Sequence, residues 1–281
     1  MRFDNTTGDL KCRVRSHRLK GGTLNFRRRF LYFLRQLGID PIRSIRGLSG
    51  FPQFLKGLFL YLFQNGFKKF QLSPALLDFS DKAGVTDGHY FWQDLIVAQW
   101  IFNEKPNAHL DVGSRLDGFV AHLLTFMEVE VLDIRPSPRV IPNLRVNMGD
   151  ATSSISVTQK HYDSVSSLHS IEHFGLGRYG DAIDINGHIK GLRNIANKVS
   201  SGGMLYVSLP IGKPTTEFNS QRILHPLWPF EILNDFELLE FVLIPWTGNP
   251  VYGLNAEDVD LQVVGQAGLY RFKKESTDIA S

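Results

Sequence analysis

The run Ala108 to Leu124, AHLDVGSRLDGFVAHLL, followed by Val129 to Pro136, VEVLDIRP, decides the fold of this chain. It predicts a strand, a glycine-bearing turn, a helix and a second strand that ends in an acidic residue. Asp111 and Gly113 close the first strand, Gly118 opens the helix, and Asp133 ends the second strand. In such a βαβ unit the turn backbone approaches a ligand closely, and the second carboxylate can bind a ribose diol. The stretch therefore indicates a nucleoside-cofactor site.

The glycine spacing separates cofactor classes. The motif is D-x-G-x-x-x-x-G, with Arg115 where a dinucleotide fingerprint has its second glycine. A pyrophosphate needs bare backbone there, so the motif favours a ligand without phosphates, such as S-adenosylmethionine (SAM). Taken alone, Gly113 and Gly118 would also fit an ordinary strand-to-helix turn.

Strands and helices alternate along the rest of the chain. NMGDAT puts Gly149 and Asp150 at the end of a third strand, and GHIKGLRNIANKV has helical spacing. Further strands are predicted at YDSVSSLHS, GGMLYVSLP, ELLEFVLIP and LQVVGQAGLYRFKK. This order predicts an α/β fold with a seven-stranded, mostly parallel sheet, helices on both faces and ligands at the carboxyl ends of the strands.

At this point the chain resembles the class I SAM-dependent methyltransferases, over roughly residues 88–272. The resemblance implies their Rossmann-like fold, SAM as cofactor, Asp133 on the ribose and Asp150 on the adenine amino group. The cofactor-binding residues it implies are Asp111, Gly113, Ser114, Gly118, Asp133, Ile134, Asp150, Ala151 and Leu168.

A narrower resemblance lies in three blocks, LHSIEHFGLGRYGDAID, SLPIG and EFNSQRI. They look like the signature blocks of an uncharacterised methyltransferase-like family common in bacterial surface-polysaccharide gene clusters. This resemblance implies O-methylation of a sugar or glycan precursor in polysaccharide or lipopolysaccharide biosynthesis. The expected acceptors are a sugar, a nucleotide sugar or a lipid-linked glycan.

The segment after the fourth predicted strand carries the densest set of catalytic side chains. His169 and His173 are four residues apart with Glu172 between them, so on a helix both imidazoles would share a face. A hydroxyl acceptor must lose its proton to a base, and we predict His169 or His173 for that role, with Glu172 orienting an imidazole. Three alternatives stay open: the histidines only hold the following loop, Glu172 and Asp181 bind a divalent metal, or H-x-x-E-H forms a zinc hydrolase or lyase site. The preferred prediction contains no metal site.

Two loops are predicted to contact the acceptor. Arg178, Tyr179 and Asp181 offer a cation, an aromatic face and an acceptor for a sugar, although an internal Arg-Asp pair would serve the turn equally well. Asn219 and Arg222 follow the fifth strand, where Arg222 could bind a carboxylate or phosphate of the acceptor, or could equally well pair with Glu217 and brace the loop.

Absent motifs narrow the acceptor. No Asn-Pro-Pro-Tyr or Asp-Pro-Pro-Tyr run follows the fourth strand, which favours oxygen or carbon acceptors over nitrogen. A non-catalytic or repurposed member of the fold, acting in a glycan-assembly complex, is the second hypothesis, since Arg115 interrupts the glycine motif.

Charge is distributed unevenly. Residues 1–70 hold fifteen Lys or Arg and three Asp, leaving sixteen basic and twenty-five acidic residues beyond them. This predicts a basic helical extension over residues 1–75, with the first 25 residues flexible, and a catalytic domain over residues 76–281. Phe30, Phe33, Leu34 and Leu37 recur at helical spacing, and a second helix is expected at FPQFLKGLFLYLF with Pro52 in its first turn.

The extension has three candidate roles. It could pack on its own domain or on a second subunit as a homodimer, contact a membrane peripherally through residues 24–70, or bind nucleic acid, which is disfavoured because no recognisable nucleic-acid module accompanies the charge. One cysteine, no secretory signal and no run of about 20 apolar residues lead us to expect a cytoplasmic protein, with peripheral contact at the inner face of the membrane.

Overall fold

The computed structural model describes residues 23–65, 70–81, 84, 86–136, 139–153 and 161–276. The chain forms two compact units, Met1–Gly84 and Val85–Ser281. The expected boundary between residues 75 and 76 stays a prediction. Of the 25 residues expected to be flexible, residues 1–22 lie outside the described part, and the last three begin a helix.

In its described residues, the first unit contains two helices, α1 (Thr23–Gln36) and α2 (Pro41–Asn65), and a short 3₁₀ turn, η1 (Asp78–Ser80). The Asp40 carboxylate accepts hydrogen bonds from the backbone N–H groups of Ile42 and Arg43, both at 3.1 Å. This N-cap, followed by proline at the first helical position, starts α2 well before the expected first turn. Pro52 consequently lies inside the helix.

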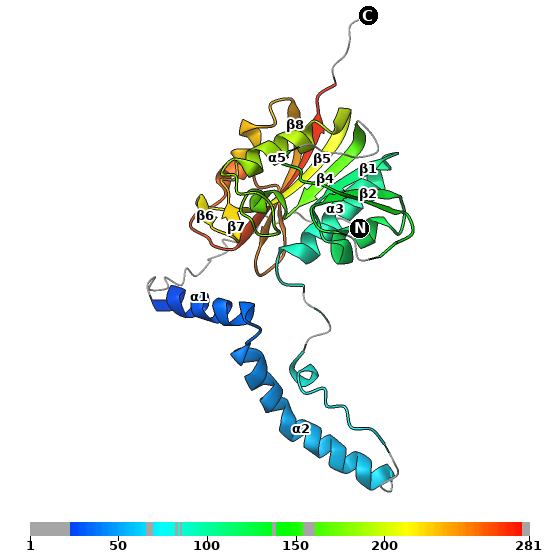
Figure 1. The fold of residues 1–281 in the computed structure, drawn as a ribbon, viewed down its shortest axis with the longest axis vertical. Coiled ribbons are helices and arrows are strands. Elements are labelled where there is room, and N and C mark those ends of the chain that lie inside the picture. The colour runs from blue at the N-terminus through cyan, green and yellow to red at the C-terminus, as the bar shows by residue number, and fades with distance from the viewer. Residues whose placement is uncertain are drawn as a thin grey trace, which may run out of the picture. The chain divides into compact units, whose positions relative to one another are not determined.

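The second unit is built on a twisted sheet with the strand order β3-β2-β1-β4-β5-β10-β8-β9 in the described residues (Figure 1). The five strands β1 to β5 run parallel, whereas β10 is antiparallel to both β5 and β8. Their bounds are His109–Val112 for β1, Val129–Asp133 for β2, Leu144–Met148 for β3, Tyr162–Leu168 for β4, Val199–Ile211 for β5, Phe236–Pro245 for β8, Val251–Tyr252 for β9 and Gln266–Lys274 for β10. The expected α/β Rossmann-like, mostly parallel sheet is therefore confirmed. The eighth strand, β9, is a two-residue edge strand that is too short to leave a sequence pattern.

Helices cover both faces of the sheet. On one face, α5 (Gly187–Ala196) packs against the strands through Leu192 and Ile195. On the other, α3 (His89–Glu104), the π-helical turn η2 (Leu116–Val120) and α4 (Ala121–Leu123) pack through residues such as Ile101 and Phe119. Successive side chains of a strand point to opposite faces of the sheet. In β5, Leu205 and Val207 face α5, whereas Tyr206 faces α3. Both faces of the central strands are therefore buried, and polar side chains within them, such as Asp111 and Ser166, are hydrogen-bonded to each other.

The segment between β5 and β8 contains a hairpin of β6 (Thr215–Glu217) and β7 (Gln221–Ile223), followed by the 3₁₀ turn η4 (Trp228–Glu231). Pro214, Pro226 and Pro229 disfavour a longer helix here, because each lacks the N–H that a helix interior requires.

Among the described helices, none combines the length and apolar character needed to cross a membrane.

Candidate active site

A pocket of about 520 Å³ lies at the carboxyl ends of β1, β2, β3 and β4, and its lining falls between Tyr90 and Asp181. β1 has β2 on one side and β4 on the other, so the chain reverses its strand order here. Open α/β sheets bind their ligands at this kind of reversal. The pocket therefore lies where the strand pattern predicts a ligand.

Most of the predicted cofactor residues line this one pocket: Gly113, Ser114, Asp133, Ile134, Asp150, Ala151 and Leu168. They come from the tips of four strands. Gly113 has a φ of +76°, and a Cβ there would lie 2.3 Å from Ser170 Oγ, so only glycine fits the turn.

Asp111 lies beneath the pocket and does not line it. Its side chain is fully buried and accepts hydrogen bonds from Ser114 N, Ser114 Oγ and Ser166 Oγ. Burial raises the pKa of Asp111 to about 6, although these hydrogen bonds oppose the shift. The carboxyl group thus supports the Gly113–Ser114 turn from below. Asp111 was predicted to contact the cofactor, but in the structure it holds the turn that lines the pocket.

Gly118 also lies outside the pocket lining. It falls within η2, which begins two residues earlier at Leu116, and a Cβ on Gly118 would lie 2.5 Å from Asp94 Oδ2. Gly118 therefore allows η2 to approach α3.

Asp133 is held by an arginine that the sequence interpretation missed. Arg135 donates from Nε to Asp133 Oδ1 at 2.9 Å and from Nη2 to Oδ2 at 2.6 Å, and its guanidinium lies 4.6 Å from the centre of the Tyr179 ring. Arg135 lines the pocket as well. Any ribose contact to Asp133 must therefore compete with this side chain.

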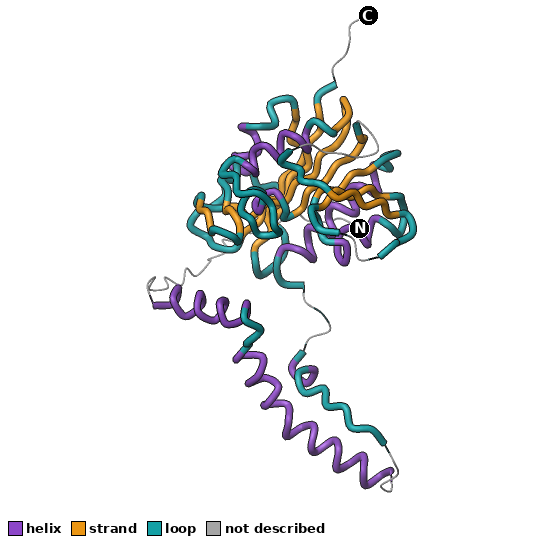
Figure 2. The backbone as a smooth tube through the Cα atoms, viewed as in Figure 1, coloured by secondary structure: helices purple, strands orange, loops and turns teal. Residues whose placement is uncertain are grey.

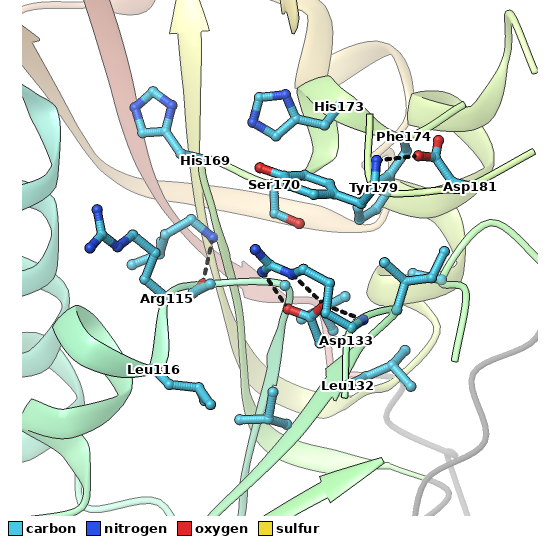
Figure 3. A pocket seen from close by; sticks show the side chains of 18 of the residues that line it. Arg115, Leu116, Leu132, Asp133, His169, Ser170, His173, Phe174, Tyr179 and Asp181 are labelled. Carbon is cyan, nitrogen blue, oxygen red and sulfur yellow. Dashed lines mark hydrogen bonds and ion pairs between the residues drawn. The ribbon is translucent and has the colours of Figure 1, made fainter. Parts of the chain in front are cut away.

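The three predicted catalytic residues occupy a short turn after β4, of which η3 (Ile171–His173) is the 3₁₀ part. His169 Nδ1 lies 2.9 Å from Glu172 Oε1, and His173 Nε2 lies 3.6 Å from the same oxygen. Figure 3 shows the two imidazoles beside each other on one side of the pocket, across from Asp133. A 3₁₀ turn replaces the helix that a shared imidazole face would need, and the carboxylate between the rings brings them together instead.

The electrostatics of this turn favour an ionised Glu172. Burial raises the pKa of its carboxyl, but the hydrogen bond with His169 and the charges of both imidazoles outweigh burial, and the pKa falls below its usual value. Burial lowers the pKa of His173. His169 adopts a left-handed backbone with φ 48°, a conformation that is uncommon for residues other than glycine.

His169 is packed between two residues of α3. Its ring stacks on His89 with centres 5.0 Å apart and touches Tyr90 at 5.4 Å. Burial and the neighbouring His169 lower the pKa of His89 to about 4. α3 thus forms one wall beside the catalytic turn.

The predicted acceptor loop lies partly in the pocket. Arg178, Tyr179 and Asp181 all line it. The Asp181 carboxylate accepts hydrogen bonds from Gly175 N at 2.8 Å and Gly177 N at 3.1 Å, so it also shapes the loop. Arg178 Nη1 donates to Ser220 O at 3.0 Å.

The other two predicted acceptor residues lie outside the pocket lining. Arg222 is 5% exposed and donates to backbone oxygens, including Phe174 O at 2.6 Å and Asp184 O at 3.3 Å. Its guanidinium holds the acceptor loop from behind and has few donors left for a substrate. Asn219 has a φ of +61° in the β6–β7 turn, a conformation that asparagine tolerates well.

A buried polar chain under the pocket also went unpredicted. Ser166 Oγ donates its hydrogen to Asp111 Oδ1 at 2.6 Å. Ser166 Oγ therefore acts as the acceptor for His109 Nε2–H, at 3.0 Å. His109 Nδ1 in turn accepts from Ser164 Oγ at 2.7 Å. The serines at alternate positions of YDSVSSL were a usable signal, because an otherwise apolar buried strand has no need of hydroxyl groups.

Within the described residues, no group of three or more His, Cys, Asp or Glu side chains is arranged to hold a metal ion. The H-x-x-E-H run lies in a tight turn, whereas the zinc motif requires a helix.

One sequence family matches part of the chain, residues 124–242, and is described as "Caenorhabditis protein of unknown function, DUF268". No curated protein sequence matches the chain. Neither finding connects the chain to bacterial polysaccharide gene clusters.

The chain is structurally similar to methyltransferases. The N-methyltransferase NodS from Bradyrhizobium japonicum WM9, in complex with S-adenosyl-L-homocysteine (SAH), aligns with a TM-score of 0.48 and 13% identity, covering 69% of this chain and 92% of its own. The 1,6-didemethyltoxoflavin-N1-methyltransferase of Burkholderia thailandensis, with bound 1,6-didemethyltoxoflavin and SAH, aligns with a TM-score of 0.47 and 12% identity. The alignment covers 80% of this chain and 89% of that enzyme. We draw no functional inference from similarity at this level.

Proposed function

We propose that the protein is a SAM-dependent methyltransferase. The observation that carries the proposal is the single pocket that joins the Gly113 turn, two strand-tip carboxylates and a buried histidine–glutamate pair. SAM supplies an electrophilic methyl group when bound. Asp133 would accept hydrogen bonds from the ribose hydroxyls and Asp150 from the adenine amino group, and the lining contains no glycine-rich phosphate cradle.

The residue we assign as general base is His169. Its Nδ1–H donates to the ionised Glu172, which leaves the lone pair on Nε2 free, and that atom has no hydrogen-bond partner among the described residues. A carboxylate that fixes one imidazole nitrogen as a donor prepares the other to accept a proton. His169 would thus take the proton of an acceptor hydroxyl as the oxygen attacks the methyl group.

His173 is the second candidate base. Its Nδ1–H donates to Ser220 O at 2.6 Å, so its Nε2 is also an acceptor, and burial keeps the ring neutral by lowering its pKa. His169 is preferred because its Nδ1–H donates to the Glu172 carboxylate, which stabilises the imidazolium formed on proton transfer, whereas the Nε2 of His173, which would have to take the proton, faces that same carboxylate at 3.6 Å.

For the acceptor we propose a sugar or nucleotide sugar. Tyr179 is 40% exposed at the pocket and carries the guanidinium groups of Arg135 and Arg178 at 4.6 and 5.3 Å. An aromatic ring can stack on a sugar, and the cations suit an anionic group such as a diphosphate. The sequence resemblance to polysaccharide-cluster proteins also supports this class.

Isothermal titration with SAH tests the cofactor assignment. We expect the wild type to bind, and Asp133→Ala and Asp150→Ala each to weaken binding by about tenfold or more, as for a lost charge-assisted hydrogen bond. Asp163→Ala is the matched control, since Asp163 contacts Asn107 at the other end of β4 and lies outside the pocket.

Absence of SAH binding in the wild type would overturn the proposal and favour the non-catalytic scaffold. Equal weakening in all three variants would show a general effect on folding and would likewise remove the support for Asp133 and Asp150.

A further inference from the structure

The first unit contributes no residue to the lining of the proposed active site, so its surface can be considered independently of the proposed methyltransferase activity. One face of α2 is covered by the chain's own returning segment, residues 70–81, which runs back beside the helix (Figures 1 and 2). A Cβ at Gly50 would lie 2.1 Å from Leu76 O, and Gly47 faces Leu77. Tyr61 meets Phe70 edge-on with ring centres 5.4 Å apart. Glycine therefore lets the segment approach closely, and this face needs no other partner.

The opposite face of α2 is apolar and exposed. Residues three and four apart lie on one side of a helix, and here this spacing defines an outer stripe of Ile45, Leu48, Pro52, Leu55, Phe59 and Phe63. Leu48 is 72% exposed, Phe59 70% and Phe63 88%. Exposed apolar side chains that form a continuous patch mark an interaction surface.

The charge of the helices indicates what this surface binds. Neither α1 nor α2 contains an acidic residue. The cationic side chains Arg43, Arg46 and Lys56 of α2 are all exposed. The single acid between the helices, Asp40, is paired with Arg35 at 3.0 Å. A second copy of these two helices, laid against the stripe, would present the same cations and be repelled. A nucleic acid would pair with the cations but leave the outer stripe in water.

We propose that the outer stripe binds the surface of an anionic lipid bilayer, with α2 lying in the plane of the membrane. Leu and Phe side chains insert into the boundary between headgroups and acyl chains, and Lys56, which borders the stripe, meets anionic headgroups. Lys56 follows Pro52 by four residues and precedes Phe59 by three, so its aliphatic stem can follow the stripe while its ammonium group stays at the surface.

Vesicle co-sedimentation of the full-length protein tests the proposal. We expect binding to phosphatidylcholine vesicles that contain about a third phosphatidylglycerol, and much weaker binding to phosphatidylcholine alone. The variant Leu48→Ser/Phe59→Ser/Phe63→Ser should bind the anionic vesicles at least about tenfold more weakly, because it removes the apolar side chains that would insert into the membrane. Val140→Ser/Ile185→Ser/Val264→Ser, at exposed positions of the second unit, is the matched control and should bind as the wild type does.

Three results would overturn the proposal. They are no binding of the wild type to anionic vesicles, full binding by the outer-stripe variant, and an oligomer in the wild type that this variant converts to monomer, which would make the stripe a self-association surface. SAH titration of the same variant separates this test from that of the enzyme, because every pocket-lining residue belongs to the second unit.

Discussion

Arg135 is the residue on which access of the proposed cofactor to Asp133 would depend most directly. It hydrogen-bonds both oxygens of Asp133 through Nε and Nη2 and lies against Tyr179. The arginine side chain is 44% exposed, so little free energy is needed to move it into water. The ion pair keeps the carboxylate ordered and would have to open for the proposed ribose contact to form.

Replacing this arginine should strengthen binding of SAH. We expect Arg135→Ala to lower the Kd by up to about fivefold, because an exposed ion pair that must break on binding is worth about 0–1 kcal/mol. Isothermal titration measures the change. Arg115→Ala is the control, since Arg115 lines the same pocket but pairs with Asp117. Weaker binding by Arg135→Ala alone would show that Arg135 contacts the ligand directly.

The two histidines should differ in their effect on turnover. We expect His169→Ala to leave SAH affinity within about twofold and to lower methyl transfer by about 100-fold or more, as for a lost general base. His173→Ala should lower it less. Transfer of labelled methyl groups from SAM to a panel of sugars and nucleotide sugars checks this prediction. Normal turnover in both variants would show that neither ring is the base.

At the scale of elements, α5 supports the catalytic turn through a glycine. A Cβ at Gly191 would lie 2.3 Å from Cδ2 of Phe174, the residue that follows η3 and lines the pocket. α5 can approach the turn this closely only because the side chain is missing. The position of the turn thus depends on a helix that itself lies outside the pocket.

This contact predicts a size-dependent substitution effect. Gly191→Ala should lower the free energy of unfolding by about 1–3 kcal/mol through overpacking, and Phe174→Leu in the same chain should restore part of it. Gly57→Ala is the contrasting control, because that helical glycine faces open space and alanine should stabilise its helix by about 0.5–1 kcal/mol. Urea unfolding monitors each variant. A neutral Gly191→Ala would mean that Phe174 moves freely and does not position the turn.

At the scale of the whole molecule, buried titratable groups make stability depend on pH. Burial lowers the pKa of His89 to about 4, of His109 to about 3 and of His188 to about 4, so these rings resist protonation in the fold while the unfolded chain gains protons below pH 6.5. The contribution of these histidines to the free energy of unfolding therefore decreases as the pH falls below 6.5. Burial raises the pKa of Asp94 and Asp111 to about 6, which opposes this trend because their stability contribution is lost as the pH rises from 3.8.

Since three groups oppose two, we expect the free energy of unfolding to fall on acidification. His109 alone should account for about 2 kcal/mol between about pH 7 and pH 5. His109→Asn should therefore flatten the pH dependence of the urea midpoint, and the exposed His122→Asn is its control. An unchanged slope in His109→Asn would show that His109 becomes protonated within the fold.

The alternation of strands and helices in the second unit could be predicted from the sequence, because it depends on residues that are close together in the chain. Apolar runs bounded by glycine, proline and aspartate indicated the main strands, and residue types at strand ends indicated a pocket that includes Gly113, Asp133 and Asp150. Parallel strands bring their carboxyl ends to one edge whatever the details of packing. For the same reason the helix α5 was expected near its observed bounds.

The partners of individual side chains depended on tertiary structure. Arg222 meets backbone carbonyls about 40 residues or more away, His109 is linked to Asp111 through a serine of β4, and Arg135 reaches Tyr179 from another loop. A sequence states which donors and acceptors exist, so it determined the sheet, its ligand edge and the uneven charge. Which donor meets which acceptor is set by the packing of distant segments, and therefore only the folded chain decided which residues face the pocket and which hold it from behind.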